Sequence, residues 1–209
     1  EHAVWRYSLD KHLELERDGR LFWGKDFSYK RPRLKRYLLE VQQGIVPSTW
    51  WSFEDCGHND EAQKETGELL ERKIFSTPKP IRLINRILRL STSKNDLTLD
   101  FFAGSGTTGE AVMRLNAEDG GQRQFILVQI PQPIDPKKQK EAHSFVKETL
   151  GKPDATIFEI TAERLRRAGA KLEAEQAAKA AESGGLFGED APTLDTGFRV
   201  FELVDDPDA

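Results

Sequence analysis

The stretch of sequence that decides the fold is LTLDFFAGSGTTG, which occupies residues 97–109. Its first part, residues 97–102, is mostly apolar and predicts a buried β-strand. The glycines at 104 and 106 follow directly, and glycine tolerates the backbone conformations that tight loops require. The residues after Gly106 predict a helix over 107–116. A strand, a glycine loop and a helix are therefore expected in immediate succession.

Regular segments flank this stretch on both sides. A helix is predicted over residues 80–90, because Ile81, Ile84 and Leu88 have helical spacing. The following segments predict a strand at 124–130, a helix at 136–150, a strand at 156–160 and a long helix at 161–181. This alternation predicts a parallel sheet with crossover helices, which is an α/β fold. The long helix is rich in Ala, Glu and Lys, and we expect it to face solvent or a partner, away from any site.

The two ends of the chain are less regular. Residues 1–60 mix aromatic, basic and turn-forming side chains, with strand-like runs at 4–7 and 21–23 and a short helix at 34–42. This mixture predicts an irregular α+β segment. Asn59 is expected to cap a helix over residues 60–70. Near the other end, a Gly-rich linker at 183–192 and a final strand at 197–204 are expected.

The glycine loop predicts a binding site for a ligand with an anionic group, because the N–H groups that open the next helix favour negative charge. A Walker-type phosphate loop is set aside, since no lysine follows Gly106 or Gly109. A dinucleotide site fits the G-x-G-x-x-G spacing from Gly104, but it needs an acid about 20 residues on, where Gln129 stands. An S-adenosylmethionine site fits, with the cofactor's carboxylate on the loop amides and its ammonium group at Asp100. A turn that only connects strand to helix is the structural alternative.

Two motifs resemble those of the β-type DNA adenine-N6/cytosine-N4 methyltransferases. Residues 99–108, LDFFAGSGTT, resemble that family's cofactor motif, and residues 75–80, FSTPKP, resemble its T-x-K-P segment. Several further stretches resemble the modification (Mod) subunits of type III restriction–modification systems, namely Trp50-Trp51 and residues 57–62, 125–129, 160–165 and 197–201. The resemblance covers nearly the whole chain and is strongest over residues 47–130.

The resemblance implies a Rossmann-like S-adenosylmethionine-dependent methyltransferase fold, present here as part of a doubly wound, parallel-rich sheet. It assigns residues 1–70 to part of a DNA target-recognition region, 71–182 to the cofactor-binding region, and 183–209 to a linker and C-terminal strand. The cofactor-binding residues that it implies are Thr77, Lys79, Pro80, Asp100, Phe101, Phe102, Ala103, Gly104, Ser105, Gly106, Thr107, Thr108 and Gln129. Gln129 stands where many methyltransferases place an acid on the ribose hydroxyls, and its amide can bond a hydroxyl without charge.

The family catalyses methyl transfer with an Asp/Asn-Pro-Pro-aromatic motif, which binds the target amino group and stacks on a base extruded from the duplex. The 209 residues hold no such tetrapeptide, because Ile130-Pro131-Gln132-Pro133 and Asp206-Pro207 do not match it. In the β-type order, this motif precedes the recognition region and the glycine loop. We therefore expect the C-terminal portion of a longer enzyme, which binds cofactor but is inactive alone. Adenine N6 is favoured over cytosine N4 as the parent enzyme's target.

Charge is distributed unevenly along a chain whose formal net charge is −4. Residues 25–36 and 72–89 are strongly basic, whereas residues 189–208 are acidic. Given the resemblance, the first basic run is expected to contact DNA phosphates. The DNA-binding candidates are Lys30, Arg31, Arg33, Lys35, Arg36, His58 and Asn59. A helix cap with exposed charges explains His58 and Asn59 equally well.

Composition bears on the cellular location of the protein and on the kinds of site that it can hold. No apolar run approaches the roughly 20 residues of a membrane span, and the sole cysteine, Cys56, offers neither an internal disulfide nor a zinc set. We expect a cytoplasmic protein without a metal, whose partners are double-stranded DNA, a second copy of itself and a restriction (Res) subunit. The competing interpretation is a non-catalytic DNA-binding or scaffold module derived from such an enzyme. A nicotinamide-dependent oxidoreductase is disfavoured because Gln129 has no neighbouring acid.

Overall fold

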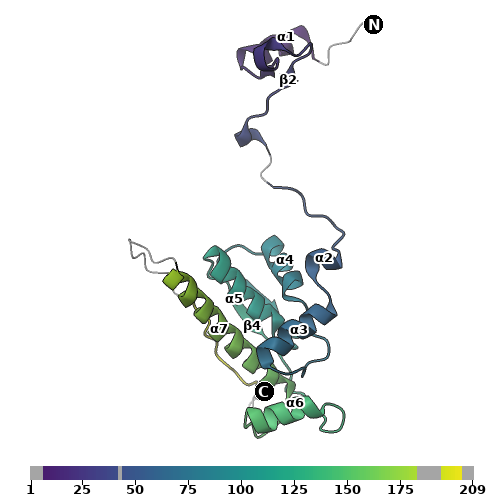
Figure 1. The fold of residues 1–209 in the computed structure, drawn as a ribbon, viewed down its shortest axis with the longest axis vertical. Helices are drawn as coiled ribbons and strands as arrows, with labels where there is room; N and C mark the ends of the chain where they lie inside the picture. Colours follow the sequence, from purple (N-terminus) through teal and green to yellow (C-terminus); the bar gives the residue numbers. More distant parts are fainter. Residues whose placement is uncertain (1–6, 42–43, 183–193, 204–209) are drawn as a thin grey trace, which may run out of the picture. The chain divides into compact units, whose positions relative to one another are not determined.

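The computed structural model describes residues 7–41, 44–182 and 194–203, and the chain divides into two compact units, Glu1–Thr49 and Trp50–Ala209 (Figure 1). In the first unit, helix α1 (Leu9–Arg17) begins after Ser8, whose hydroxyl accepts a hydrogen bond from the Lys11 amide. Strands β1 (Leu21–Phe22) and β2 (Arg33–Leu34) pair antiparallel, and 3-10 turns occupy Lys25–Phe27 and Leu38–Glu40. The unit is thus a small, irregular α+β structure.

The second unit holds the α/β part of the chain. Its elements are α2 (Phe53–Cys56), α3 (Asn59–Leu70), α4 (Ile81–Ser91), β3 (Leu97–Asp100), α5 (Thr107–Asp119), β4 (Gln124–Leu127), α6 (Lys140–Ser144), a π-helical turn (Phe145–Thr149) and α7 (Ile157–Glu182). Strands β3 and β4 pair in parallel, with Leu97 opposite Gln124 and Asp100 opposite Leu127. The expected parallel pairing with a crossover helix is therefore confirmed for these two strands.

Helices cover one face of this parallel pair. Helix α5 packs against α4 through a buried cluster of Ile81, Leu88, Ala111, Val112 and Leu115, on which Phe125 of β4 also rests. On its other side, α5 packs against α7 (Figure 1) through a second cluster of Met113, Leu165, Ala168 and Leu172. One part of the core thus lies between α4, α5, α7 and β4, and another packs Leu70 at the end of α3 and the α6 region against Ile160 of α7.

The opposite face of the sheet is open in the described part of the chain. Because successive strand residues point to opposite faces, Leu97, Leu99 and Ile126 project away from the helices, and they are 57%, 50% and 48% exposed. Parallel strands are normally buried on both faces. The sheet is therefore only partly covered by the elements that the structure describes.

Two expected strands are absent from the described residues. Residues 157–160 open α7, since Ile157 and Ile160 lie one helical turn apart and both pack in one apolar cluster, while Thr156 forms only an isolated bridge with Pro133. Residues 197–203 have no regular structure, because no neighbouring described strand completes a ladder with them. Val204 lies outside the described residues.

Other boundaries differ for local reasons. The expected helix at 34–42 is wrong, because Leu34 pairs in β2 and only Leu38–Glu40 turns, while Gln42 is not described. The helix expected from Pro136 begins at Lys140, because Gln139 has φ of −127° and ψ of 51°, so the turn that Asp135 caps at Lys137 and Lys138 does not continue into α6. The strand-like run at 21–23 is confirmed over β1, whereas residues 4–6 of the other run are not described.

None of the helices in the described ranges combines the length and apolar character that crossing a membrane requires.

Because the described helices cover only one face of the sheet, substitutions on its two sides test the fold. Leu115 is fully buried, so Leu115→Ala is expected to lower the free energy of unfolding by about 2–5 kcal/mol. Leu99 is half exposed on the open face, so Leu99→Ala is expected to cost less than about 1 kcal/mol. Urea denaturation of both variants measures the difference, and equal losses would show that the open face is buried in solution.

The pH dependence of stability gives a second test of the fold, at Glu65 of α3. Burial raises the pKa of this carboxyl above its ordinary value of 4.5, and the nearby carboxylates of Glu61 and Glu110 add to the effect. The folded state thus binds the proton more tightly than the unfolded state, so ionisation costs stability above pH 4.5 and not below it. Glu65→Gln is expected to raise Tm at pH 7, and the gain should shrink as the pH falls through the raised pKa towards 4.5.

Exposed Glu68, on the same helix, provides the matched control for that experiment. Glu68→Gln should leave the dependence of Tm on pH close to that of the parent chain. A Glu65→Gln gain that persisted unchanged at pH 3 would contradict the assignment to carboxylate burial.

Candidate functional site

The loop between β3 and α5 turns through two glycines in the left-handed region. Gly104 has φ of 54° and Gly106 has φ of 82°, conformations that a residue with a Cβ adopts only with strain. Gly106 is also the N-cap of α5, and no side chain caps the helix there. The first N–H groups of an α-helix have no acceptor inside the helix, so the start of α5 offers donors to a ligand.

Hydrogen bonds fix this loop to the end of β4. The amide of Ala103 donates to the carbonyl of Val128 at 3.1 Å, and the amide of Gly104 donates to Oε1 of Gln129 at 2.7 Å. The other end of the Gln129 side chain, Nε2, donates to the carbonyl of Ile130 at 2.9 Å. The side chain expected at the ribose hydroxyls therefore braces the loop itself, and the ribose contact stays a prediction.

Asp100 ends β3 and bridges the two sides of the loop. Its Oδ1 accepts a hydrogen bond from the Phe102 amide at 3.0 Å, and its Oδ2 accepts one from the Thr108 hydroxyl at 2.6 Å. An ionised carboxylate has about four acceptor sites. Asp100 can therefore hold the loop and still accept hydrogen bonds from an ammonium group.

The segment at 75–80 lies against the same loop, as the resemblance implied. The hydroxyl of Thr107 donates to the carbonyl of Lys79 at 3.3 Å, and a Cβ at Gly104 would lie 3.7 Å from Cζ of Phe75. Thr77 and Lys79 are exposed at the side chain, whereas Pro80 is buried as the N-cap of α4. The two sequence motifs that suggested the site are thus joined in space.

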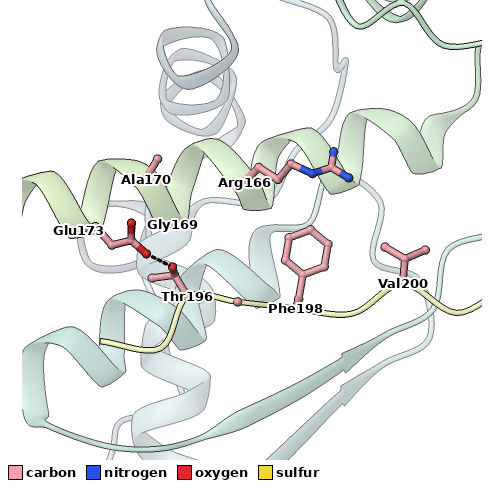
Figure 2. A pocket seen from close by; sticks show the side chains of 8 residues that line it. Arg166, Gly169, Ala170, Glu173, Thr196, Phe198 and Val200 are labelled. Atoms are coloured by element: carbon pink, nitrogen blue, oxygen red, sulfur yellow. Dashed lines mark hydrogen bonds between the residues drawn. The ribbon is translucent and has the colours of Figure 1, made fainter. Parts of the chain in front are cut away.

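The loop is open on its outer side. Phe101 and Phe102, at its start, are 63% and 86% exposed, and Ile130 beyond β4 is 69% exposed. A hollow of about 320 Å³ lies elsewhere, between α7 and residues 196–200 (Figure 2), where Arg166 stacks over Phe198 and Thr196 bonds Glu173. None of the cofactor-binding or DNA-binding residues expected from the sequence lines that hollow.

A buried ion pair lies beneath the loop, and the sequence analysis missed it. Arg164 of α7 donates from Nε to Oε2 of Glu110 of α5 at 2.7 Å, and both side chains are almost completely buried. Arg164 also donates from Nη1 to the hydroxyls of Ser105 and Thr107, at 2.7 and 2.9 Å. The start of α7 therefore contacts the glycine loop, and the expectation that this helix lies away from the site is wrong.

One signal in the sequence could have identified that pair. Arg164 stands within a run of residues at helical spacing, Ile160, Arg164, Ala168 and Leu172, which are otherwise apolar and are all buried in the structure. Charged side chains are rarely fully buried unless they are paired. A single arginine in the apolar face of a helix therefore predicts a buried acidic partner.

The DNA-binding candidates fall into both units. Lys30, Arg31, Arg33, Lys35 and Arg36 are all exposed in the first unit. The guanidinium of Arg33 lies 4.9 Å from the ring centre of Tyr29, and the amine of Lys35 lies 5.9 Å from that of Phe22. Exposed basic side chains that are grouped in one small unit can contact phosphates.

His58 and Asn59 lie in the second unit, close to the segment at 75–80. His58 is the N-cap of α3 and Asn59 is its first residue, so the helix begins one residue earlier than expected and Asn59 is not its cap. A Cβ at Gly57 would lie 2.7 Å from Cβ of Pro80, so this turn packs directly on the segment. Beside it, the Arg82 guanidinium bonds Glu61 in two places and holds the pKa of that carboxyl below its ordinary range.

Comparisons with known proteins agree with these motifs. A family model described as DNA methylase, of the N6/N4 type, matches residues 6–161. The chain is 36% identical over 183 residues to the Mod subunit of the type III restriction-modification enzyme StyLTI from Salmonella typhimurium, a match that covers 87% of this chain and 26% of that protein. It is 39% identical over 182 residues to the EcoPI Mod subunit from Escherichia phage P1, covering 85% of this chain and 23% of the relative.

A type II methyltransferase, M.KpnI from Klebsiella pneumoniae, is 38% identical over 129 residues, which cover 62% of this chain and 30% of the relative. The chain thus spans about a quarter of the length of the Mod subunits that it matches. The family model matches well over half of the chain, from the first unit to the start of α7. The chain therefore belongs to the N6/N4 DNA methylase family.

Proposed function

We propose that this chain supplies the S-adenosylmethionine-binding part of a DNA amino-methyltransferase of a restriction–modification system. The observation that carries the proposal is the loop at 101–106, which joins β3 to the uncapped start of α5 and has the 75–80 segment at its side. The methyl acceptor would be an exocyclic amine of DNA, with adenine N6 as the first candidate. The restriction–modification context rests on the Mod subunits among its relatives.

The donors and acceptors around the loop fit the carboxylate and the ammonium group of the cofactor's methionine part. First-turn amides of α5 suit a carboxylate, because the helix N-terminus carries partial positive charge. Asp100 suits the ammonium group, since each of its oxygens is engaged once and can accept again. The cofactor, when bound, supplies the activated methyl group, and Thr77, Lys79 and Gln129 are proposed to line its remaining sides.

Methyl transfer needs more than this loop. The Asp/Asn-Pro-Pro-aromatic pattern does not occur in the 209 residues. We therefore propose that these residues bind the cofactor and do not transfer the methyl group by themselves. The exposed apolar side chains of Leu97, Leu99 and Ile126 support a further layer of structure over the sheet in the active enzyme.

DNA contact is proposed for the exposed basic residues of the first unit, Lys30, Arg31, Arg33, Lys35 and Arg36. Association with a Res subunit is proposed from the Mod subunits of restriction-modification enzymes among the relatives, and association with a second copy of this chain is proposed from the sequence resemblance alone. A non-catalytic DNA-binding module is the second candidate function, and the exposure of the five basic residues of the first unit supports it. Such a module would bind DNA with no response to the cofactor.

Isothermal titration calorimetry with S-adenosylmethionine tests the cofactor site. Gly104→Val is expected to weaken binding at least about tenfold, which corresponds to about 1.4 kcal/mol, because φ of 54° strains a branched side chain and distorts the loop. Gly120→Val is the matched control, since Gly120 has φ of 67°, lies at the far end of α5, and has open space around its Cβ position. Absence of binding by the parent chain would remove the proposed function.

Salt-dependent DNA titration tests the basic surface and separates the two candidate functions. Arg33→Ala and Arg36→Ala together are expected to weaken binding of duplex DNA and to reduce the slope of log K against log salt by about 2, or about one per lost phosphate contact. Lys171→Ala with Lys179→Ala, which removes exposed lysines of α7, is the control and should leave that slope unchanged. A DNA affinity that is the same with and without saturating S-adenosylmethionine would favour the non-catalytic module.

A further inference from the structure

Two charged side chains are buried under the glycine loop, and no step of the proposed function uses them. Arg164 is 0% exposed and Glu110 is 1% exposed. Removing two charged groups from water costs about as much free energy as their attraction gains. A buried ion pair therefore adds little net stability compared with apolar side chains of similar size. The placement of this pair at the loop therefore suggests a role beyond stability.

The guanidinium of Arg164 fixes several segments relative to one another. Its Nε bonds Glu110 at 2.7 Å, and its Nη1 bonds the hydroxyls of Ser105 and Thr107 at 2.7 and 2.9 Å. The same Thr107 hydroxyl lies 3.3 Å from the carbonyl of Lys79. Because a guanidinium is planar and its donors have fixed directions, these contacts set the position of the loop relative to α5, α7 and the 75–80 segment.

Thr161 acts one turn earlier on the same helix. Its hydroxyl lies 2.6 Å from the carbonyl of Gly104 and 3.0 Å from that of Ile157, so the shorter contact holds the loop backbone. Gly106 packs directly on it, since a Cβ there would lie 3.2 Å from Cγ2 of Thr161. The carbonyl of Gly104 and the hydroxyls of Ser105 and Thr107 are thereby all bonded from the α7 side.

We propose that Thr161 and Arg164 are positioning residues for the cofactor loop. By bonding the inward carbonyl and hydroxyls, they leave the first amides of α5 free to face a ligand on the open side. Arg164 is fully buried, so it acts through the loop and does not touch the ligand. The inference rests on the proposed function for its ligand, while the geometry of the loop can be tested without one.

The experiment compares two loop variants with two matched controls in the full chain. Arg164→Lys keeps the charge opposite Glu110 but cannot reproduce the fixed fork, and Thr161→Val removes only the hydroxyl. Arg123→Lys is the control for the first, because Arg123 is buried at the other end of α5 and paired with Asp119. Thr66→Val is the control for the second, because Thr66 is buried and its hydroxyl has no hydrogen-bond partner among the described residues.

Each protein is measured for its Kd for S-adenosylmethionine, its Tm, and amide hydrogen exchange over residues 101–108 and over 111–116 of α5. Arg164→Lys and Thr161→Val are each expected to raise Kd at least about fivefold and to speed exchange at 101–108 only. Their Tm should stay within about 3 °C of that of their controls. The double variant Arg164→Met with Glu110→Gln, which removes both buried charges, should show the same loop defect if Arg164→Lys does not fold.

Three results overturn the inference: Kd unchanged in the loop variants although the parent chain binds, exchange unchanged at 101–108, or a rise in Kd that follows a general loss of Tm with faster exchange throughout. If the parent chain binds no S-adenosylmethionine, the proposed function fails. The positioning role is then decided by exchange alone, with faster exchange confined to 101–108 supporting it.

Discussion

The carbonyl of Gly104 and the hydroxyl of Thr161 are 2.6 Å apart, and this contact joins a loop to a helix that starts 53 positions later in the chain. The ion pair between Arg164 of α7 and Glu110 of α5 is a second contact between the same two parts of the chain. The loop can approach α7 so closely because Gly106 has no side chain, and a Cβ there would be within 3.3 Å of the Thr161 backbone. The position of the loop relative to α7, and through Thr107 to the 75–80 segment, depends on this close approach.

The sequence predicted the centre of the second unit well, because each element there has its own local signal. The apolar run of β3, the glycines of the loop and the helical spacing in α4 and α5 each specify a segment without reference to distant residues. The contact between the loop and Lys79 was also expected, through the resemblance of two motifs. The failed strand at 156–160 and the buried Arg164 depend instead on packing and pairing with other elements, whereas the shifted helix boundaries have local causes.

Ile157 and Ile160 illustrate that failure. They are β-branched and follow a turn that contains Gly151 and Pro153, which favours a strand, yet they form the first inward turn of α7 because Ile160 packs in an apolar cluster with Phe145 and Val146. Arg164 was assigned to a helix that faces solvent or a partner because Ala, Glu and Lys dominate the segment, and its contacts with the distant Glu110 and the loop hydroxyls explain its burial. The ribose contact expected of Gln129 stays a prediction, while its Oε1 accepts a hydrogen bond from the Gly104 amide.

The pair formed by Arg164 and Glu110 has a consequence for the order in which the molecule acquires its loop. The two residues are 54 positions apart, and contacts of such long sequence separation form late, after shorter-range contacts have reduced the entropy of closure. During synthesis, α5 leaves the ribosome well before α7, so until α7 docks the glycine loop would be held only by its bonds to β3, α5 and the end of β4. We expect a nascent chain that ends before α7 to hold its strand and helix without the competence to retain a small molecule.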